Sequence, residues 1–396
     1  MSTDTELRAL RAEHIGSLVH PDGLREVFVR HDRHEAGEEE LLRAQDEAIR
    51  EVIRKQEALG LKVVGDGELR RRNFQESFSA CVSGFDVTPE AARSYAHENV
   101  NKTPLERAEQ DFDAVGPAIT TRRKTVAKLR LTRNLPLEEY RFASGATSRT
   151  VKPTLIGPDR IAQRFKWEES RSVYPGGLDE FTDDVVRIER SMIADMVAAG
   201  CRYVQIDAPG YTAYVDRVSL DRMRSRGEDP DENLERSIHA DNALIDGFPG
   251  VTFGIHLCRG NARTHDPETG ELVPQWHREG HYDAIAERLF NGLRHHRFLL
   301  EYDSDRAGSF EPLRFVPAGK TVVLGLVTTK SARLESVDEL RRRVDEAARY
   351  CPPDQLALSP QCGFASGLYH ESLSEDDQWR KLDRIVETAS AIWGGR

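Results

Sequence analysis

Three side chains that bind soft or borderline metals lie at the ends of two apolar runs. His256 and Cys258 follow the run at residues 251–255, and Cys362 follows the run at residues 356–358. On an extended backbone, residues i and i+2 point the same way, so His256 and Cys258 are expected on one side of a strand. One imidazole and two thiolates are donors that zinc prefers, and a carboxylate or a substrate could complete the tetrahedron. We therefore predict a mononuclear zinc site built on strand ends.

The runs that carry these residues belong to an alternation of strand and helix patterns. Helical periodicity covers residues 38–59, 181–199, 232–245, 282–293, 336–350 and 375–393, and another helix begins near Asp159. Eight short strands are expected to end near Ser17, Glu68, Ile156, Asp207, Cys258, Glu301, Thr328 and Cys362. Eight parallel strands with intervening helices form a (β/α)8 TIM barrel. The fold class is therefore predicted as α/β, with one barrel domain over residues 1–396.

The predicted strand ends carry most of the chemically capable side chains. In a (β/α)8 barrel the active site gathers at the carboxyl ends of the strands. The side chains at those ends are Ser17, Glu68, Asp207, His256, Cys258, Glu301, Lys330 and Cys362. Strand ends with a purely structural role would not need so many polar groups, so this placement strengthens the zinc hypothesis. The arginines at 70–72 are expected on a solvated face, which an anionic substrate tail could also use.

Residues 88–151 interrupt the alternation. They are rich in charge and show little periodicity, apart from residues 118–131 and 138–142, which could pair outside the barrel. The segment holds too few large apolar residues for a core of its own. We predict an insertion after the second strand, lying over one mouth of the barrel.

Composition limits the classes of partner. The 396 residues carry a formal net charge of -11, whereas a nucleic-acid binder is expected to present a basic face. No apolar run is long enough for a membrane helix, and the N-terminus lacks the apolar segment of a secretion signal. Five scattered cysteines are too few for a disulfide framework. A cytoplasmic protein with no nucleic-acid or membrane partner is expected.

The strand-end motifs together resemble the C-terminal catalytic barrel of cobalamin-independent methionine synthase, and most of all its short single-barrel relatives. The resemblance runs from about residue 11 to residue 393. It rests on a combination of motifs: Ile15-Gly16-Ser17, Gln205-Ile206-Asp207, His256-x-Cys258, Glu301, and Cys362 within Ser-Pro-Gln-Cys-Gly-Phe.

The resemblance implies a ligand set, a substrate pocket and a reaction. It implies that zinc is held by His256, Cys258, Glu301 and Cys362, and that an amino-acid thiol is held by Ile15, Ser17, Glu68 and Asp207. Zinc lowers the pKa of a bound thiol, so a nucleophilic thiolate forms at neutral pH. The implied enzyme is a methyltransferase in which the homocysteine thiolate attacks a methyl donor and methionine forms. Its partners would be the thiol and the donor, either a folate or a corrinoid protein.

Three departures from the family pattern leave parts of this expectation open. Ala208 stands where the family usually has an acidic residue after Gln-Ile-Asp. Lys330 stands at the seventh strand end, where the full-length synthase has a histidine proton donor, so either Lys330 is the catalytic acid or the leaving group differs. The chain is also expected to lack the N-terminal half of the synthase, which leaves the methyl donor unnamed.

Two alternative functions stay open, and the first of them is motivated by Ala208 and Lys330. A zinc-dependent alkyl transferase or lyase of the epoxyalkane and coenzyme M type would use a related barrel, and its sulfonate thiol would favour a cation such as Lys330 and need no ammonium pocket. A barrel that only binds a thiol, or accepts a methyl group from a corrinoid protein without turnover, is the other alternative. Such a binder has no evident need for a complete thiolate-rich ligand set.

Overall fold

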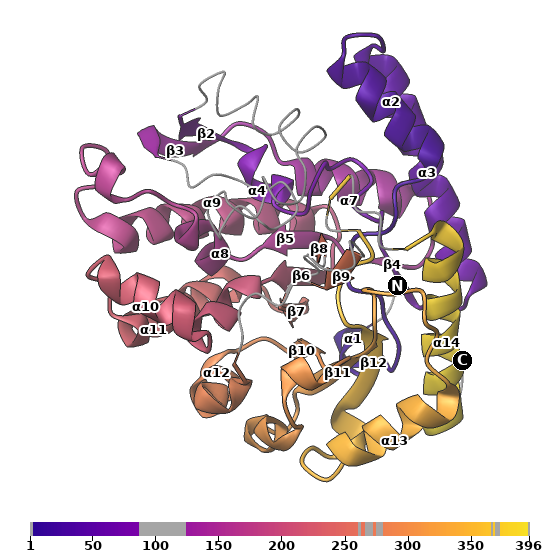
Figure 1. Ribbon diagram of the computed structural model, residues 1–396. Coiled ribbons are helices and arrows are strands. Elements are labelled where there is room, and N and C mark those ends of the chain that lie inside the picture. Colours follow the sequence, from indigo (N-terminus) through magenta and orange to yellow (C-terminus); the bar gives the residue numbers. More distant parts are fainter. Residues whose placement is uncertain are drawn as a thin grey trace.

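Parallel strands lie at the centre of the molecule and helices surround them (Figure 1). The computed structural model describes residues 3–86, 124–259, 263–265, 272–274, 280–365, 367–368 and 373–394. Six strands form one parallel sheet in the order β12-β11-β10-β7-β6-β5. Their bounds are β5 (Thr154–Ile156), β6 (Tyr203–Asp207), β7 (Thr252–Leu257), β10 (Arg297–Glu301), β11 (Thr321–Val327) and β12 (Leu356–Pro360). Every residue of these strands is buried, as expected when both faces of a parallel sheet are covered.

Two further strand segments close this sheet into a barrel. Strand β1 (Val63–Val64) pairs in parallel with β4 (Thr150–Val151), which directly precedes β5. The segment at residues 11–13 adds to the other edge through a parallel bridge between Ala12 and Leu358. It continues to a hydrogen bond of 3.0 Å from the Leu18 N–H to the Gly67 carbonyl, beside β1. These contacts agree with the predicted (β/α)8 fold.

The helices follow the sequence pattern closely. Those in the described ranges are α1 (Asp4–Arg8), α2 (Asp22–Asp32), α3 (Glu38–Ala58), α4 (Glu76–Ser79), α7 (Leu135–Gly145), α8 (Pro158–Gln163), α9 (Gly177–Ala198), α10 (Arg217–Ser225), α11 (Pro230–Ile245), α12 (Ala286–Gly292), α13 (Val337–Ala347) and α14 (Glu375–Trp393). Ser336 caps α13, since its side chain accepts from the Glu339 N–H. The helix predicted over residues 282–293 divides instead into the 3-10 turn η3 (Tyr282–Ala284) and α12, because Ile285 has the non-helical φ of -124°.

The segment predicted as an insertion is described in part, since residues 87–123 lie outside the described residues. Strand β3 (Thr125–Leu131) pairs antiparallel with β2 (Val82–Phe85), so the predicted pairing of residues 118–131 with 138–142 is wrong. Residues 138–142 belong instead to α7, whose N-cap Asn134 accepts from the Leu137 N–H. The assignment of residues 88–151 to an insertion stays a prediction, although β4 pairs with β1 as part of the barrel.

Strand register sets which side chains share a level inside the barrel. Leu299 is aligned with Val323, which is aligned with Ala357, and these three pack with Ile15 in a small buried cluster. The same register aligns Leu299 with His256, and His256 with Asp207. The polar residues of the predicted site therefore lie beside an apolar layer rather than in the larger core beneath the helices.

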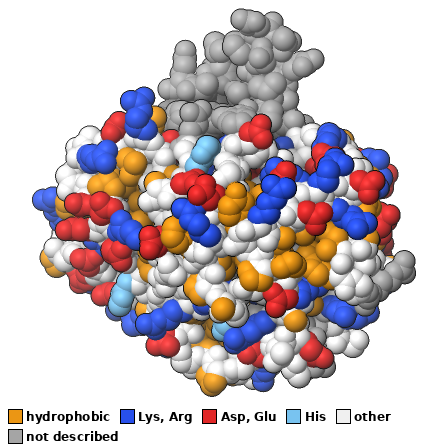
Figure 2. Space-filling model, turned by 90° about the horizontal axis from the view of Figure 1, so that it is seen from below, with side chains coloured by type: hydrophobic (Ala, Val, Ile, Leu, Met, Phe, Trp, Pro, Cys, Tyr) orange, Lys and Arg blue, Asp and Glu red, His pale blue; other side chains and the backbone are white. Residues whose placement is uncertain are grey.

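The surface of the described part is mixed in charge. On the face shown in Figure 2, acidic and basic side chains alternate over short distances, so its described residues form no continuous basic patch. None of the helices in the described ranges combines the length and the apolar character that a membrane span needs.

Candidate metal centre

His256, Cys258 and Cys362 come together at the carboxyl ends of β7 and β12. His256 lies in β7, Cys258 follows its last residue, and Cys362 lies two residues beyond β12. Their ligand atoms all lie within 4.8 Å of one another, and all three residues are buried. This is the one group of three metal-binding side chains that the described residues contain. The juxtaposition predicted from the two apolar runs is therefore present.

The orientation of His256 is set from the neighbouring strand. Asp207 is its register partner on β6, and the two side chains meet with 3.1 Å between Nδ1 and Oδ1. The other ring nitrogen, Nε2, is buried and has no hydrogen-bond partner among the described residues. Metal-bound histidines usually have this arrangement: a carboxylate contacts one ring nitrogen, and the other ring nitrogen is left to bind the metal.

The charges of the three residues are strongly coupled. Burial alone lowers the pKa of His256, but the Cys258 thiolate and the Asp207 carboxylate raise that pKa to about 10. A hydrogen bond from Cys362 holds the pKa of Cys258 well below its usual value, and the same contact raises the pKa of Cys362. The cluster thus stabilises a thiolate at Cys258. A soft anionic sulfur, a second sulfur and an imidazole nitrogen fit zinc.

Glu301, the fourth ligand that the resemblance implies, lies beside the group of three but is not part of it. It ends β10 two residues after Leu299, the partner of His256. Its Oε2 accepts from the Arg259 N–H at 2.7 Å, and its Oε1 accepts from Lys330 Nζ at 2.9 Å. Burial raises the pKa of Glu301, but Lys330 and Arg306 outweigh it and lower the pKa overall. Glu301 is therefore a charged carboxylate with both oxygens occupied by protein donors.

Lys330 is bound to two carboxylates. Its Nζ lies 2.9 Å from Glu301 Oε1 and 2.9 and 3.0 Å from the two oxygens of Asp303. Burial lowers the pKa of Lys330, yet these two carboxylates raise it overall. Sequence reasoning did not assign Asp303 to the site, although its spacing of two from Glu301 on a strand end was a usable signal.

Glu68 occupies a strained turn after β1. Its φ is 58°, an uncommon value for a residue with a side chain, and it follows Gly67 with φ 73°. Glu68 Oε1 accepts from Thr154 Oγ1 at 2.7 Å, whereas Oε2 has no hydrogen bond and lies 3.7 Å from Arg71 Nη1. Burial raises the pKa of Glu68 to about 7, opposed by Arg71 and assisted by the nearby Asp207 carboxylate.

The predicted turn at Ile15, Gly16 and Ser17 packs between Glu68 and the cysteine loop. A Cβ on Gly16 would lie 2.6 Å from Glu68 Oε1, and a Cβ on Gly363 would lie 2.0 Å from Ser17 Oγ. Both glycines therefore permit close approach. The side chain of Ile15 packs in the apolar layer with Leu299, so any substrate contact at that position would be through the backbone.

The prediction that the arginines at 70–72 share one solvated face is wrong. Arg71 is 1 % exposed and donates to both oxygens of Glu139 and to Thr154. The error arose because Glu139 belongs to α7, a helix that the sequence pattern did not reveal. Arg71 connects this helix to the turn that holds Glu68.

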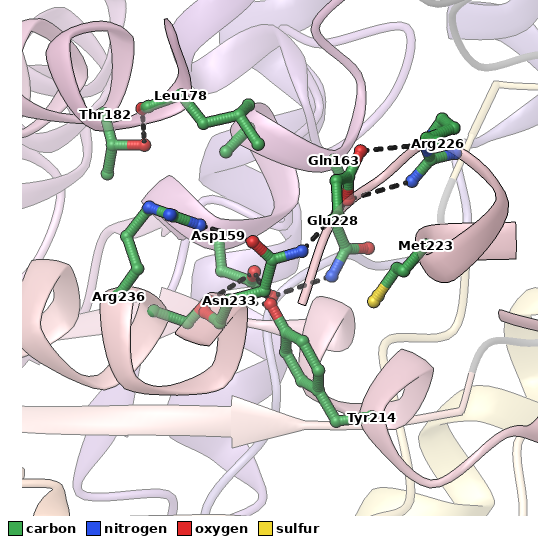
Figure 3. A pocket seen from close by; sticks show the side chains of 12 residues that line it. Asp159, Gln163, Leu178, Thr182, Tyr214, Met223, Arg226, Glu228, Asn233 and Arg236 are labelled. Carbon is green, nitrogen blue, oxygen red and sulfur yellow. Dashed lines mark hydrogen bonds and ion pairs between the residues drawn. The ribbon is translucent and has the colours of Figure 1, made fainter. Parts of the chain in front are cut away.

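A separate pocket lies outside the barrel, among α8, α9, α10, α11 and the 3-10 turn η2 (Pro209–Tyr214) (Figure 3). Its central carboxylate, Asp159, accepts from Tyr214 at 2.9 Å, from Ser237 at 2.6 Å and from Gln163 at 3.0 Å. None of the predicted site residues lines it. We therefore place the candidate site at the strand ends.

Comparison with known proteins identifies the family of the chain. A family model described as the cobalamin-independent synthase catalytic domain matches residues 11–242 and 300–388. The uncharacterized protein YxjG of Bacillus subtilis (strain 168) is 33% identical over 387 residues, which cover 97% of this chain and 94% of that protein. The methionine synthase of Pyrococcus abyssi (strain GE5 / Orsay) is 25% identical over 360 residues, covering 91% and 87%.

Among solved structures, a candidate vitamin-B12 independent methionine synthase from Listeria monocytogenes has a TM-score of 0.71 at 24% identity and covers 98% of both chains. This likeness concerns the fold. The family match spans most of the chain and includes the strand ends that carry Asp207 and Cys362. The chain therefore belongs to the cobalamin-independent methionine synthase family of methyltransferases, as its strand-end motifs predicted.

Proposed function

We propose that this protein transfers a methyl group to the thiol of homocysteine and forms methionine, with zinc at His256, Cys258 and Cys362. The observation that carries the proposal is the position of this donor set beside two buried carboxylates, Glu68 and Asp207. A metal next to an anionic pocket suits a substrate that has a thiol at one end and an ammonium group at the other.

The metal would be held by His256, Cys258 and Cys362, and Glu301 would be a fourth ligand only after exchanging one of its protein donors. When bound, zinc lowers the pKa of a coordinated thiol, so that the thiol is ionised at neutral pH. Asp207 holds His256 through Nδ1. This contact keeps Nε2 directed at the two sulfurs and lets the three residues act as one preformed site.

The ammonium group of the substrate would be held by Glu68 and Asp207. Glu68 Oε2 has no hydrogen bond, and both bonds to Asp207 end on Oδ1. Each residue can therefore offer one oxygen. The turn at Ser17 lies against both Glu68 and the Cys362 loop, so it would border the space between the ammonium pocket and the metal.

Lys330 is the candidate acid for the leaving group, as the strand-end position suggested. Its raised pKa keeps Nζ protonated at neutral pH, but a strongly held proton makes a weak acid. Lys330 also fixes Glu301 and Asp303, so its loss would disturb the carboxylates around the metal.

Two observations weigh against the alternative with coenzyme M. Lys330 is already neutralised by Glu301 and Asp303, which leaves it little attraction for a sulfonate. Glu68 and Asp207 would also repel a sulfonate placed near the metal. These charges favour a substrate with a cationic end.

The test combines zinc analysis with X-ray absorption at the metal. We expect about one zinc per chain and one added sulfur ligand with homocysteine but not with coenzyme M. Purified protein should then form methionine when supplied with a methyl donor, tested as a methylated folate and as a methylated corrinoid protein. Full activity in protein stripped of metal would contradict the zinc proposal, and a sulfur ligand gained only with coenzyme M would move the assignment to the lyase type.

A further inference from the structure

A continuous path of hydrogen bonds runs through the barrel interior to His256. At its far end, Glu13 accepts from Arg297 Nη2 at 2.6 Å and from Lys152 Nζ at 2.8 Å. Lys152 Nζ also lies 2.7 Å from Gln205 Oε1. Gln205 Nε2 then lies 2.8 Å from Asp207 Oδ1, the atom that meets His256.

Strand geometry explains why these residues meet. Tyr203, Gln205 and Asp207 alternate along β6 and point into the barrel, where Gln205 is aligned with Gly254 on β7. A Cβ on Gly254 would lie 3.2 Å from the Tyr203 hydroxyl, so a glycine keeps this space open. Lys152 and Gln205 are at most 1 % exposed, so water does not compete for their bonds.

The two bonds made by the Gln205 side chain have only one possible direction. A lysine ammonium group donates and never accepts, so the Gln205 atom facing Lys152 must be the carbonyl oxygen. The Gln205 amide nitrogen therefore faces Asp207 and donates to Oδ1. Because Asp207 accepts this bond, Oδ1 stays beside Nδ1 of His256, and Nε2 is left for a metal.

We propose that Gln205, oriented by Lys152, is a positioning residue of the metal centre, because its amide holds the Asp207 carboxylate that directs His256. The inference rests on the proposed function, in which His256 binds zinc. Gln205 is not one of the three metal-binding side chains, and its contact with the candidate site is the bond to Asp207. Its effect reaches His256 through Asp207 alone.

Three variants separate positioning from simple packing. Gln205→Leu removes the amide at similar volume. Gln205→Glu keeps an acceptor for Lys152 but cannot donate to Asp207. The control, Tyr203→Phe, removes the 2.8 Å bond from the same strand to Glu13 and leaves Gln205 untouched. Circular dichroism and thermal unfolding establish that each variant is folded before metal is added.

Zinc affinity is measured by competition with a chromophoric chelator, and the Nδ1 proton of His256 is followed by NMR in zinc-loaded protein labelled with 15N-histidine. We expect both Gln205 variants to bind zinc about 10-fold or more weakly, and the Nδ1 proton to exchange faster with water. Tyr203→Phe should retain wild-type affinity and exchange. Wild-type affinity in Gln205→Glu would overturn the inference, since packing and the Lys152 bond alone would then suffice.

The outcomes also distinguish this inference from the proposed function. Wild-type protein that binds no zinc would overturn both. If the wild-type protein binds zinc, and Gln205→Leu and Gln205→Glu bind it with the same affinity, only the positioning role would be overturned. An equal loss of affinity in Tyr203→Phe would also overturn that role, because the effect would then come from the whole network rather than from the amide.

Discussion

Two buried polar clusters inside the barrel differ in how completely they satisfy their own hydrogen bonds. Around Glu13, both carboxylate oxygens accept bonds, supplied by Arg297, Lys152 and Tyr203. Around His256, the Nε2 atom has no hydrogen-bond partner among the described residues. Leaving a buried polar atom unpaired costs about 1–3 kcal/mol, so a fold retains such an atom when something else binds it.

This difference between the two clusters shows that burial and charge alone do not identify a metal or substrate site. The Glu13 cluster holds a carboxylate and two cations, yet both oxygens of that carboxylate already accept hydrogen bonds from protein groups. An unpaired atom is not sufficient either: His295 has two unpaired ring nitrogens, but it belongs to no group of metal-binding side chains in the described residues. The His256 cluster combines an unpaired atom with two further donors of the right chemistry.

The largest expected effect is the loss of the metal in Cys362→Ala. Removing one of three protein donors should weaken zinc binding by more than about 100-fold, a larger loss than changing a residue that only contacts a donor, and should reduce methyl transfer to background. Chelator competition and a methionine assay would measure both. Cys351→Ala, which removes a buried cysteine outside the cluster, is the matched control and should keep full zinc content.

The opposite pattern is expected for Glu13→Gln. This change leaves two buried cations with a neutral partner, which should lower the free energy of unfolding by about 3–5 kcal/mol. Zinc affinity in the folded fraction should change less than about threefold, because Lys152 still donates to Gln205. Urea unfolding and chelator competition separate the two effects, with the exposed Glu26→Gln as control. A variant of wild-type stability would break the distinction between the two clusters.

A smaller effect is expected for Lys330→Met, which leaves Glu301 and Asp303 without their shared cation. If Lys330 only positions these carboxylates, zinc affinity should fall about 10-fold while the turnover rate on saturated, zinc-loaded protein stays near normal. If Lys330 is the acid, turnover should fall by about 100-fold or more with zinc affinity retained. Lys320→Met, which removes a lysine outside the site, controls for the loss of charge.

The sequence pattern indicated where the strands end and therefore where the candidate metal-binding side chains lie. The period of two placed His256 and Cys258 on one side of a strand, and parallel topology brought Cys362 to the same end of the barrel. The sequence pattern did not indicate which residues far apart in the chain pair with each other. Arg71 was placed on a solvated face because its partner, Glu139, belongs to an unrecognised helix.

The same limit applies to the interior network. Glu13 and Arg297 are separated by 284 positions, and nothing local to either residue indicates that they meet. The sequence offers Lys330 as a candidate acid, but it does not reveal that Glu301 and Asp303 both face this residue. Sequence patterns thus located the chemistry at the strand ends, while the partners that tune each group depend on closure of the barrel.

The smallest effect concerns pH and the unpaired oxygen of Glu68. Since burial raises the pKa of Glu68 to about 7, its carboxyl is mostly neutral at pH 6 and mostly charged at pH 8. A charged carboxylate attracts an ammonium group and a neutral one does not, so methionine affinity should rise as pH increases. The change in ionised fraction predicts about a tenfold rise.

Calorimetric titration with methionine avoids the substrate thiol, whose own ionisation would confuse the result. In Glu68→Gln the methionine affinity should be low and nearly independent of pH over this interval. The control is Glu139→Gln, which changes a buried carboxyl that is bonded to Arg71. This control should keep the dependence of methionine affinity on pH. A slope that persists in Glu68→Gln would mean that another group titrates with the ligand, and the unpaired Oε2 would then not be part of the ammonium pocket.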